Sequence, residues 1–513
     1  MLGLGLVLVV LVALPVAPSD LDRHQFPKET LWHATVLLAV LLARPWPALG
    51  LGPAQRLALL ALGGWSVVTL CFADNPWLAF RAVSLTITAL IALLVARHVA
   101  SAGASRILLG WAAMAAATAA ATGLAQAAGI EHQFFNELRA PGGTLGNRNF
   151  LAHLAAASIP IQSLLIFTAR RRWVPLPTIG LALSSAMLVL SRSRAGWLAA
   201  LAAIGVMFVT IAIAKRSAGV DLSRKRLFTA LLTPVVAIAL AVLAPTTLEW
   251  RSDSPYTETL GNLANYREGS GRGRLLQYRN TLELVRQHPV VGVGPGNWPL
   301  HYGSVAPRND PSFARNDVVP LNPWPSSDAV ALVSERGIPG LLAALLLALA
   351  CCWRVIPAMR AGDRRALGGA ALAGTTVAIG VAGMFDAVLL LAVPAGFAAV
   401  CIGALLSEAD GAGEAVPTPR NGVMLLLLVI PVALGLFRST TQTTAYLIAG
   451  DGSTRTRLER AAVIDPFNYQ LRIRLARGPC RTSREHARAA LRLAPTWPAA
   501  QAAARRCGVS PDD

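Results

Sequence analysis

Two groups of arginines lie beside long apolar segments, where a guanidinium is costly unless it meets an anion or water. Arg192 and Arg194 lie between two apolar runs, and Arg272 and Arg274 lie in the arginine- and glycine-rich stretch 266–274. A guanidinium is a planar fork that matches pairs of phosphate oxygens and keeps its charge at physiological pH. Two such groups from different segments could clamp a pyrophosphate and stabilise the negative charge that grows as it departs.

The same residues have a purely structural interpretation. Arg192 and Arg194 can extend toward the bilayer interface while their alkyl stems remain among apolar side chains. The arginines between residues 267 and 286 can form a solvated face or bind anionic lipid. Residue type alone therefore leaves both an anion site and an interfacial role open.

Asn147 and Asn149 lie in the glycine-containing segment 142–149, directly before another apolar run. The glycines permit a tight turn, and the amide side chains can bind sugar hydroxyls or cap the following helix. Helix capping is sufficient to account for them.

The composition places these residues in a membrane protein. Of 513 residues, 54% are hydrophobic and only 14% are charged, which does not fit a soluble globule. The formal charge of +19 is spread over many loops rather than gathered on one domain, so nucleic-acid binding is not indicated. No zinc-type Cys/His spacing and no nucleotide-binding fingerprint is present, and no metal or cofactor is expected.

Apolar runs that are each able to cross a hydrocarbon core of about 30 Å recur along the chain. They lie near residues 2–17, 31–49, 56–74, 80–97, 107–128, 149–168, 174–191, 195–214, 227–246, 329–353, 366–384, 388–407 and 421–438. The sequence therefore predicts an all-α polytopic protein of about 12–13 transmembrane helices. If the N-terminus is cytoplasmic, basic loops such as 170–172 are cytoplasmic too. That orientation places residues 247–327 and the Arg192–Arg194 pair outside the cytoplasm.

Three parts are expected: a membrane domain over residues 1–438, a large polar loop over 247–327 inside it, and a helical tail over 439–513. A loop of this length is usually functional or disordered. From residue 273 to 287 a helix is predicted, with an apolar stripe and a separate arginine stripe. The apolar stripe comprises Leu275, Tyr278, Leu282 and Val285, and the arginine stripe comprises Arg272, Arg279 and Arg286.

The tail contains two similar helix endings, residues 458–466 and 488–495, whose prolines lie 29 residues apart. Helical hairpin repeats of the tetratricopeptide kind end in this way, although their usual period is nearer 34. The tail is therefore either a small helical cap or a module for a protein partner. Cys480 and Cys507 lie in it, and a disulfide between them is permitted if the tail is outside the cytoplasm.

Taken in chain order, these residues resemble the O-antigen ligase and polymerase family of bacterial membrane glycosyltransferases. The matching pieces are GTLGNRNF (143–150), SRSRAG (191–196), SGRGRL (270–275), HPVVGVGPGNW (288–298) and SSDAVALVSERGIPG (326–340). Each piece alone is weak, but five in family order within one membrane topology are fairly specific.

The resemblance implies an enzyme of the bacterial inner membrane that transfers a glycan from undecaprenyl pyrophosphate to an acceptor hydroxyl without metal. The acceptor would be a lipid, a polysaccharide or a protein. Arginines matching Arg194 and Arg274 would hold the pyrophosphate, with Arg272 as a helper. The large loop and the tail would then lie in the periplasm.

One departure concerns the histidine that the family carries before the glutamate matching Glu335, because Ser326 stands there and a serine cannot take up a proton near pH 7. Asp328, Glu335, His288 or His301 could replace it, or pyrophosphate departure could need little base help, or transfer activity could be lost. The candidate catalytic residues are Arg194, Arg274, Asp328 and Glu335. The candidate substrate-binding residues are Arg192, Arg272, Arg279, Asn147, Asn149, His288, His301 and Ser326.

Two other functions remain as alternatives. A transporter for an anion such as bicarbonate would need ionisable residues lining a path at mid-span, whereas the predicted spans are nearly free of charge. A non-catalytic scaffold that binds lipid-linked glycan is favoured if Ser326 reflects lost chemistry.

Overall fold

The computed structural model describes residues 1–43, 51–136, 139–220, 222–250, 252–263, 265, 269–307, 310, 323–411 and 422–510. Residues 266–268 of the arginine-rich stretch and residues 44–49 of the second predicted span lie outside these ranges. The described residues form helices and no strands, and the predicted all-α membrane fold is confirmed.

Nine described segments are long and apolar enough to cross a bilayer. The helices in them are α4 (Pro76–Val99), α5 (Ser105–Ala127), α6 (Arg148–Thr168), α7 (Pro175–Leu190), α8 (Arg194–Ala218), α9 (Arg224–Leu243), α13 (Asp328–Cys352), α14 (Val355–Ala361), α15 (Asp363–Phe385), α16 (Ala392–Asp410) and α17 (Gly422–Ala449). α4 and α5 form one segment that bends at the short helix Ala100–Ala104, where Gly103 has φ 93°. The chain is thus a multi-pass membrane protein.

The first helices differ from the predicted spans. α1 (Leu2–Leu11) has ten residues, about 15 Å, and is shorter than a hydrocarbon core. α2 runs over Asp20–Leu42 and α3 over Pro53–Leu70. Hydropathy predicts a loop over the polar first half of α2, but two of its charged side chains have partners within the protein. The buried Lys28 ammonium donates to the carbonyl of Val10 at 3.0 Å, and Arg81 donates to Glu29 at 2.8 Å.

Small residues let the central helices approach closely. α6 and α16 are the most enclosed of the candidate spans. A Cβ on Gly196 of α8 would lie 2.7 Å from Ala152 of α6, and a Cβ on Gly403 of α16 would lie 2.6 Å from the carbonyl oxygen of Leu93 of α4. Packing through small residues is typical of helix contacts in membranes. It fixes the ends of α6 and α8 side by side.

The large loop carries three helices: α10 (Pro255–Gly261), α11 (Gly269–Gln287) and α12 (Trp298–Val305). We call the end of the bundle that bears them the loop end. The predicted helix over 273–287 is present, but its predicted stripes are wrong. Leu275 and Leu282 are exposed, and the buried residues are Gln277, Thr281 and Leu284.

The exposed residues of α11 form one stripe rather than two, because positions three and four apart share a helix face. This stripe comprises Arg272, Leu275, Arg279, Leu282 and Arg286. The opposite face makes both apolar and polar contacts, because Leu284 belongs to a hydrophobic cluster with Trp298 and Leu300 while its neighbours on the same face are polar. For example, Trp298 Nε1 donates to the Thr281 hydroxyl at 3.1 Å.

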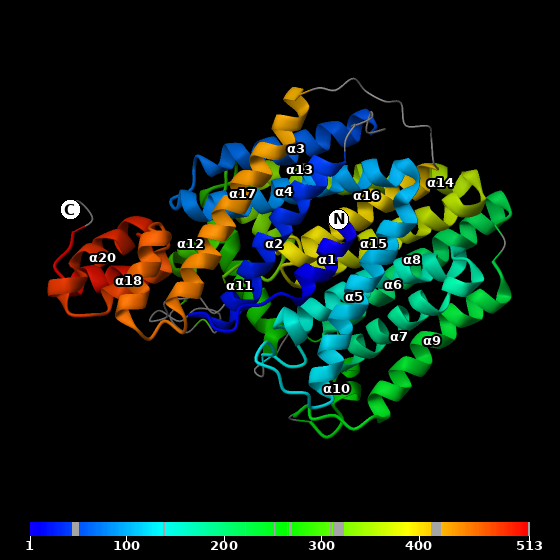
Figure 1. The fold of residues 1–513 in the computed structure, drawn as a ribbon, viewed down its shortest axis with the longest axis horizontal. Helices are drawn as coiled ribbons and strands as arrows, with labels where there is room; N and C mark the ends of the chain where they lie inside the picture. The colour runs from blue at the N-terminus through cyan, green and yellow to red at the C-terminus, as the bar shows by residue number, and fades with distance from the viewer. Residues whose placement is uncertain are drawn as a thin grey trace.

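The tail forms two helical hairpins, α18 (Arg455–Ile464) with α19 (Tyr469–Ala476) and α20 (Cys480–Leu493) with α21 (Pro498–Arg506). α19 and α21 begin 29 residues apart, the same offset as the two prolines in the sequence. The tail lies at the left of Figure 1, against α12, and α14 lies at the upper right. A single hydrophobic cluster joins the tail to the loop through Trp497 and Tyr469 on one side and Trp298 and Leu300 on the other.

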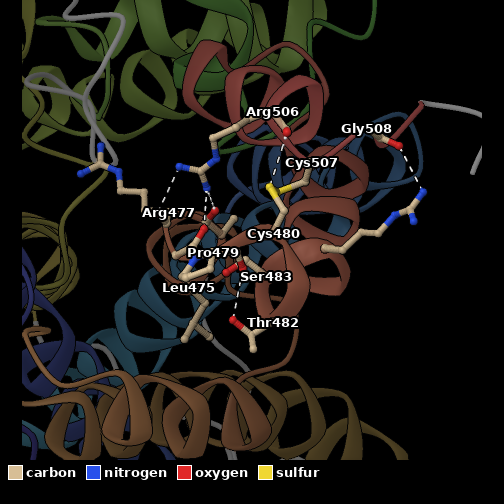
Figure 2. Close-up of a disulfide and its surroundings, with 12 residues drawn as sticks. Leu475, Arg477, Pro479, Cys480, Thr482, Ser483, Arg506, Cys507 and Gly508 are labelled. Atoms are coloured by element: carbon tan, nitrogen blue, oxygen red, sulfur yellow. Dashed lines mark hydrogen bonds between the residues drawn. A yellow bond between two sulfur atoms is a disulfide. The ribbon is translucent and has the colours of Figure 1, made fainter.

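Cys480 and Cys507 form a disulfide that joins the start of α20 to the end of α21, with their Cα atoms 5.1 Å apart. Arg506, beside this disulfide, donates to the carbonyl of Ala476, the last residue of α19, and to those of Arg477 at 3.1 Å and Gly478 at 3.0 Å. Figure 2 shows the guanidinium reaching the end of α19 next to the two sulfur atoms. The last carbonyls of α19, which have no partner within their own helix, are satisfied in this way.

Candidate functional site

Ser326, where the sequence resemblance predicts a histidine, is bound directly to α11. Its backbone N–H donates to Gln277 Oε1 at 2.7 Å, and its carbonyl accepts from the Tyr278 hydroxyl. The same hydroxyl donates to the carbonyl of Met384 at 2.9 Å. Since Gln277 follows Arg274 by one turn of helix, the structure brings Ser326 and Arg274 to one place.

Two further ionisable residues lie near the loop end, His153 in the first turns of α6 and Asp386 directly after α15. His153 is 3% exposed, and its Nε2 has no hydrogen-bond partner among the described residues. The charges of Asp386 and Arg274 both act on its imidazole. The Arg274 guanidinium makes no hydrogen bond or ion pair with another described residue. An imidazole, a carboxylate and a guanidinium without a partner among the described residues therefore lie within electrostatic range of one another near the loop end.

The sequence did contain a signal for His153. It is the one ionisable side chain of α6 beyond the helix start, and an ionisable residue inside an apolar span is by default a functional candidate. What brings it to Asp386 and Arg274 is the packing of α6 against α15 and of α11 against the start of α13. These contacts are not encoded in any local pattern.

Arg192 and Arg194 bind the segment that leads into α11. Arg192 donates to the Thr259 hydroxyl at 2.8 Å and to Glu258 at 2.9 Å, and its backbone has φ 51°. Arg194 Nη1 donates to the carbonyls of Asn262 at 2.8 Å and Asn265 at 2.7 Å. Both arginines therefore fix the loop beside α11, and Arg194 reaches the chain four residues before that helix begins.

A third arginine at the loop end, Arg148, was also missed. The guanidinium groups of Arg148 and Arg192 lie 5.0 and 4.8 Å from the ring centroid of Trp250. Each is therefore within cation–π distance of the indole. Together with Arg194 they give the outer ends of α6 and α8 a concentrated positive charge.

Glu335 holds the glycine-rich segment that follows α11. Its carboxylate accepts from the N–H of Gly296 at 2.8 Å, and it lies 3.8 Å from the Arg336 guanidinium. α13 is broken at Gly337, where φ is 69° and a Cβ would lie 1.9 Å from the carbonyl oxygen of Val290. Ile338 N–H donates to the carbonyl of Pro289 at 2.9 Å. The motifs 288–298 and 326–340 therefore contact each other here through backbone atoms.

Asp328 supports the connection between α15 and α16. Its carboxylate accepts from the N–H groups of Val388 at 2.9 Å and Leu389 at 3.0 Å. The neighbouring Ser327 hydroxyl donates to the carbonyl of Gly383 at 3.0 Å. This connection carries Asp386, so Asp328 helps to position the carboxylate near His153.

Asn147 caps α6: its side-chain oxygen accepts from the N–H of Asn149 at 3.0 Å. Asn149 is half-buried. The N-terminal end of α6 is thereby fixed six residues before His153.

His288 and His301 form a separate group, with ring centroids 6.3 Å apart. His301 Nε2 lies 3.2 Å from Asp74 Oδ2. Burial lowers the pKa of His301, and the charge of Asp74 partly opposes that shift. His288 follows Arg274 by 14 residues, about 20 Å along α11. The structure therefore does not bring these histidines to the Arg274 cluster, and the exposed Arg272 and Arg279 point away from it on the outer stripe.

An apolar groove of about 650 Å³ runs between α5, α7 and α9. It extends along α9 from Phe228 and past the end of that helix to Thr246, and it includes Leu190 at the end of α7. The N–H of Thr247 donates to the carbonyl of Ala127 at 3.0 Å and closes the groove at the loop end. Leu190 precedes Arg192 by two residues, so hydrocarbon surface leads directly to the arginines.

These features define a helical membrane protein with a polar, arginine-rich site at one end of its bundle. Residues 179–345 match the family model described as O-antigen ligase. That match includes four of the five motif pieces and supports the O-antigen ligase family for this chain. No curated protein gives a significant match. The family indicates a membrane glycosyltransferase-type enzyme, with lipid-linked glycan and polysaccharide as its classes of substrate.

Proposed function

We propose that the protein transfers a glycan from undecaprenyl pyrophosphate to an acceptor hydroxyl at the periplasmic face of the bacterial inner membrane. The observation that carries this proposal is the Arg274 guanidinium, which makes no hydrogen bond or ion pair with another described residue and lies one helical turn before Gln277, the residue that binds Ser326. A positive fork beside a proton acceptor is what departure of a pyrophosphate and attack by a hydroxyl require.

Arg274 would bind the pyrophosphate directly. Arg194 is already bonded to two loop carbonyls, so it would contribute its charge and the position of the segment before α11. Arg148 and Arg192 would add to the positive potential. The polyprenyl chain would lie in the apolar groove between α7 and α9, which ends close to Arg192.

His153 is our candidate for the base that is missing at Ser326. In the reaction, the acceptor oxygen forms a bond to the anomeric carbon, and the bond from that carbon to the phosphate oxygen breaks. The acceptor proton moves to His153 Nε2, and the pyrophosphate leaves with the bonding electrons. Asp386 would stabilise the imidazolium. Because His153 is buried, acceptor binding must displace part of the packing around it.

The periplasmic orientation has two supports. The Cys480–Cys507 disulfide suits an oxidising compartment. The tail that carries it packs on the large loop, so both belong to one side. The arginines of residues 170–172 lie at the opposite end, as the positive-inside rule requires of a cytoplasmic face.

The proposal is tested with purified protein in liposomes that contain undecaprenyl pyrophosphate glycan and an acceptor glycan. Arg274→Ala should reduce transfer at least a hundredfold, and Arg274→Lys should restore little because the fork is lost. Arg279→Ala removes the same charge from the exposed face of the same helix and should leave transfer within twofold of the wild type.

Three outcomes would contradict the proposal. Transfer by Arg274→Ala at the wild-type rate excludes the pyrophosphate role. Donor binding without turnover by the wild-type protein would identify a scaffold. Passage of bicarbonate through the protein without transfer would identify a transporter.

A further inference from the structure

A second cavity lies at the end of the bundle opposite the loop, between α5, α6, α7, α9 and α15. Its volume is about 2020 Å³, well above the roughly 300–1,000 Å³ that is usual for small-molecule sites. α10, α11 and α12 contribute none of its described lining. It is therefore distinct from the site around Arg274.

The cavity has a strongly basic rim. The described lining contains no acidic residue and five arginines, which are Arg106, Arg170, Arg226, Arg364 and Arg365. Arg226 is occupied, since it donates to the carbonyl of Ala169 at 2.7 Å. Arg106 lies 3.8 Å from Glu408. The other three make no hydrogen bond or ion pair with another described residue. Their charges require an anion or water.

The interior of the cavity is apolar. Trp111, Met114 and Ile179 line it, and on α5 the lining extends from Arg106 to Ala117. Eleven residues of helix span about 16 Å, half of a hydrocarbon core of about 30 Å. The cavity thus has the depth of one leaflet, with its positive charges at the level of the headgroups.

We propose that this cavity holds an anionic glycerophospholipid, with its phosphate at Arg170, Arg364 and Arg365 and its acyl chains against α5 and α7. Basic recesses between transmembrane helices are suited to anionic headgroups, and guanidinium groups bind phosphate in pairs. A free phosphate would leave the apolar walls uncovered, and a zwitterionic lipid, which has no net charge, would not neutralise the positive charge of the rim. The inference does not depend on the proposed glycan transfer.

The binding test uses delipidated full-length protein titrated with dioleoyl phosphatidylglycerol or dioleoyl phosphatidylcholine, with bound lipid measured by native mass spectrometry. The triple variant Arg170→Gln/Arg364→Gln/Arg365→Gln should bind phosphatidylglycerol at least tenfold more weakly. The control Arg171→Gln/Arg172→Gln/Arg216→Gln removes the same charge from exposed residues outside the lining and should stay within twofold of the wild type.

A second pair of variants tests the cavity itself while keeping every arginine. A Cβ on Gly110 of the lining meets no atom within 4 Å, so Gly110→Trp should fill the cavity and abolish tight lipid binding. Gly205→Trp also projects into open space but on α8, outside the lining, and should bind as the wild type does.

Any of three results would overturn the inference. Equal weakening by the two arginine triples would show general electrostatic attraction. Equal affinity for phosphatidylcholine would show filling by any lipid. Displacement of phosphatidylglycerol by millimolar inorganic phosphate would show an anion site without a lipid.

Discussion

Ser326 donates its backbone N–H to Gln277 Oε1 at 2.7 Å, three residues from Arg274 on the same helix. The position where the family carries a histidine is therefore adjacent to the proposed pyrophosphate ligand even though the histidine is absent. His153 approaches the same place from α6. An imidazole at residue 326 and the imidazole of His153 are thus two alternatives for the same role.

We expect His153→Gln to lower kcat by about a hundredfold or more, because loss of a general base typically costs 10²–10⁴-fold. Donor binding should be unchanged, because the arginines remain. The measurement is single-turnover transfer in liposomes together with the donor Kd. His288→Gln and His301→Gln serve as controls and should keep the wild-type rate.

A rescue experiment separates a chemical role of His153 from a structural one. Adding Ser326→His to His153→Gln should recover at least tenfold of the lost rate, since the new imidazole would stand beside Arg274. If the double variant is as slow as His153→Gln alone, while both variants remain folded, the base assignment fails.

The crossing between the glycine-rich segment and α13 should be sensitive to a single methyl group. Gly337→Ala places a Cβ 1.9 Å from the Val290 carbonyl oxygen at φ 69°, and the combined clash and strain should cost about 3 kcal/mol or more. Thermal unfolding in lipid nanodiscs measures the loss. Gly380→Ala, whose Cβ meets open space, should be neutral.

The tail should depend on its disulfide. Joining residues 27 apart stabilises a chain by about 3–4 kcal/mol in the loop-entropy description. The variant Cys480→Ser/Cys507→Ser should therefore show faster amide exchange and proteolysis in α20 and α21. α6 and α16 should exchange as before, and Cys71→Ser, which alters an unpaired thiol, should change neither region.

The packing of α12 should weaken in acid. Burial lowers the pKa of His301 below its ordinary value of 6.5, so between the folded pKa and 6.5 the unfolded segment binds more protons than the folded one. Stability is then full above about pH 6.5 and falls as the pH drops toward the folded pKa. Amide protection factors in α12 at pH 7 and pH 5 measure this.

His301→Gln should reduce that pH dependence, whereas His132→Gln, which changes an exposed histidine, should not. An unchanged ratio of protection factors in the His301 variant would rule out this residue as the source.

The sequence was sufficient to predict the helical membrane body because apolar runs report directly on bilayer spans. It misplaced the start of α2, where Lys28 donates to the carbonyl of Val10 and Glu29 accepts from Arg81 inside the protein. On α11 the sequence pattern predicted separate leucine and arginine stripes, whereas these leucines and arginines lie on one exposed face. Glu335 was predicted to be a catalytic residue, but the motif around it also packs against the backbone of the glycine-rich segment. That packing depends on residues about 40 positions earlier in the sequence.

The candidate site was predicted in part. Arg194, Arg274 and Ser326, which were selected through the resemblance to the family motifs, are all at the loop end. His153, Asp386 and Arg148 were missed because their proximity arises from helix packing. A lone histidine in α6 becomes a candidate only when the opposing helix is known.

The break in α13 at Gly337 has a consequence for biogenesis. Its partner, the Pro289–Val290 peptide, is synthesised before α13, so the ribosome delivers the docking site ahead of the helix that needs it. The two halves of α13 can then integrate in sequence, the first against the glycine-rich segment that is already synthesised and the second into lipid. Inserting residues between α12 and α13 should thus slow maturation of the protein more than it alters the finished product.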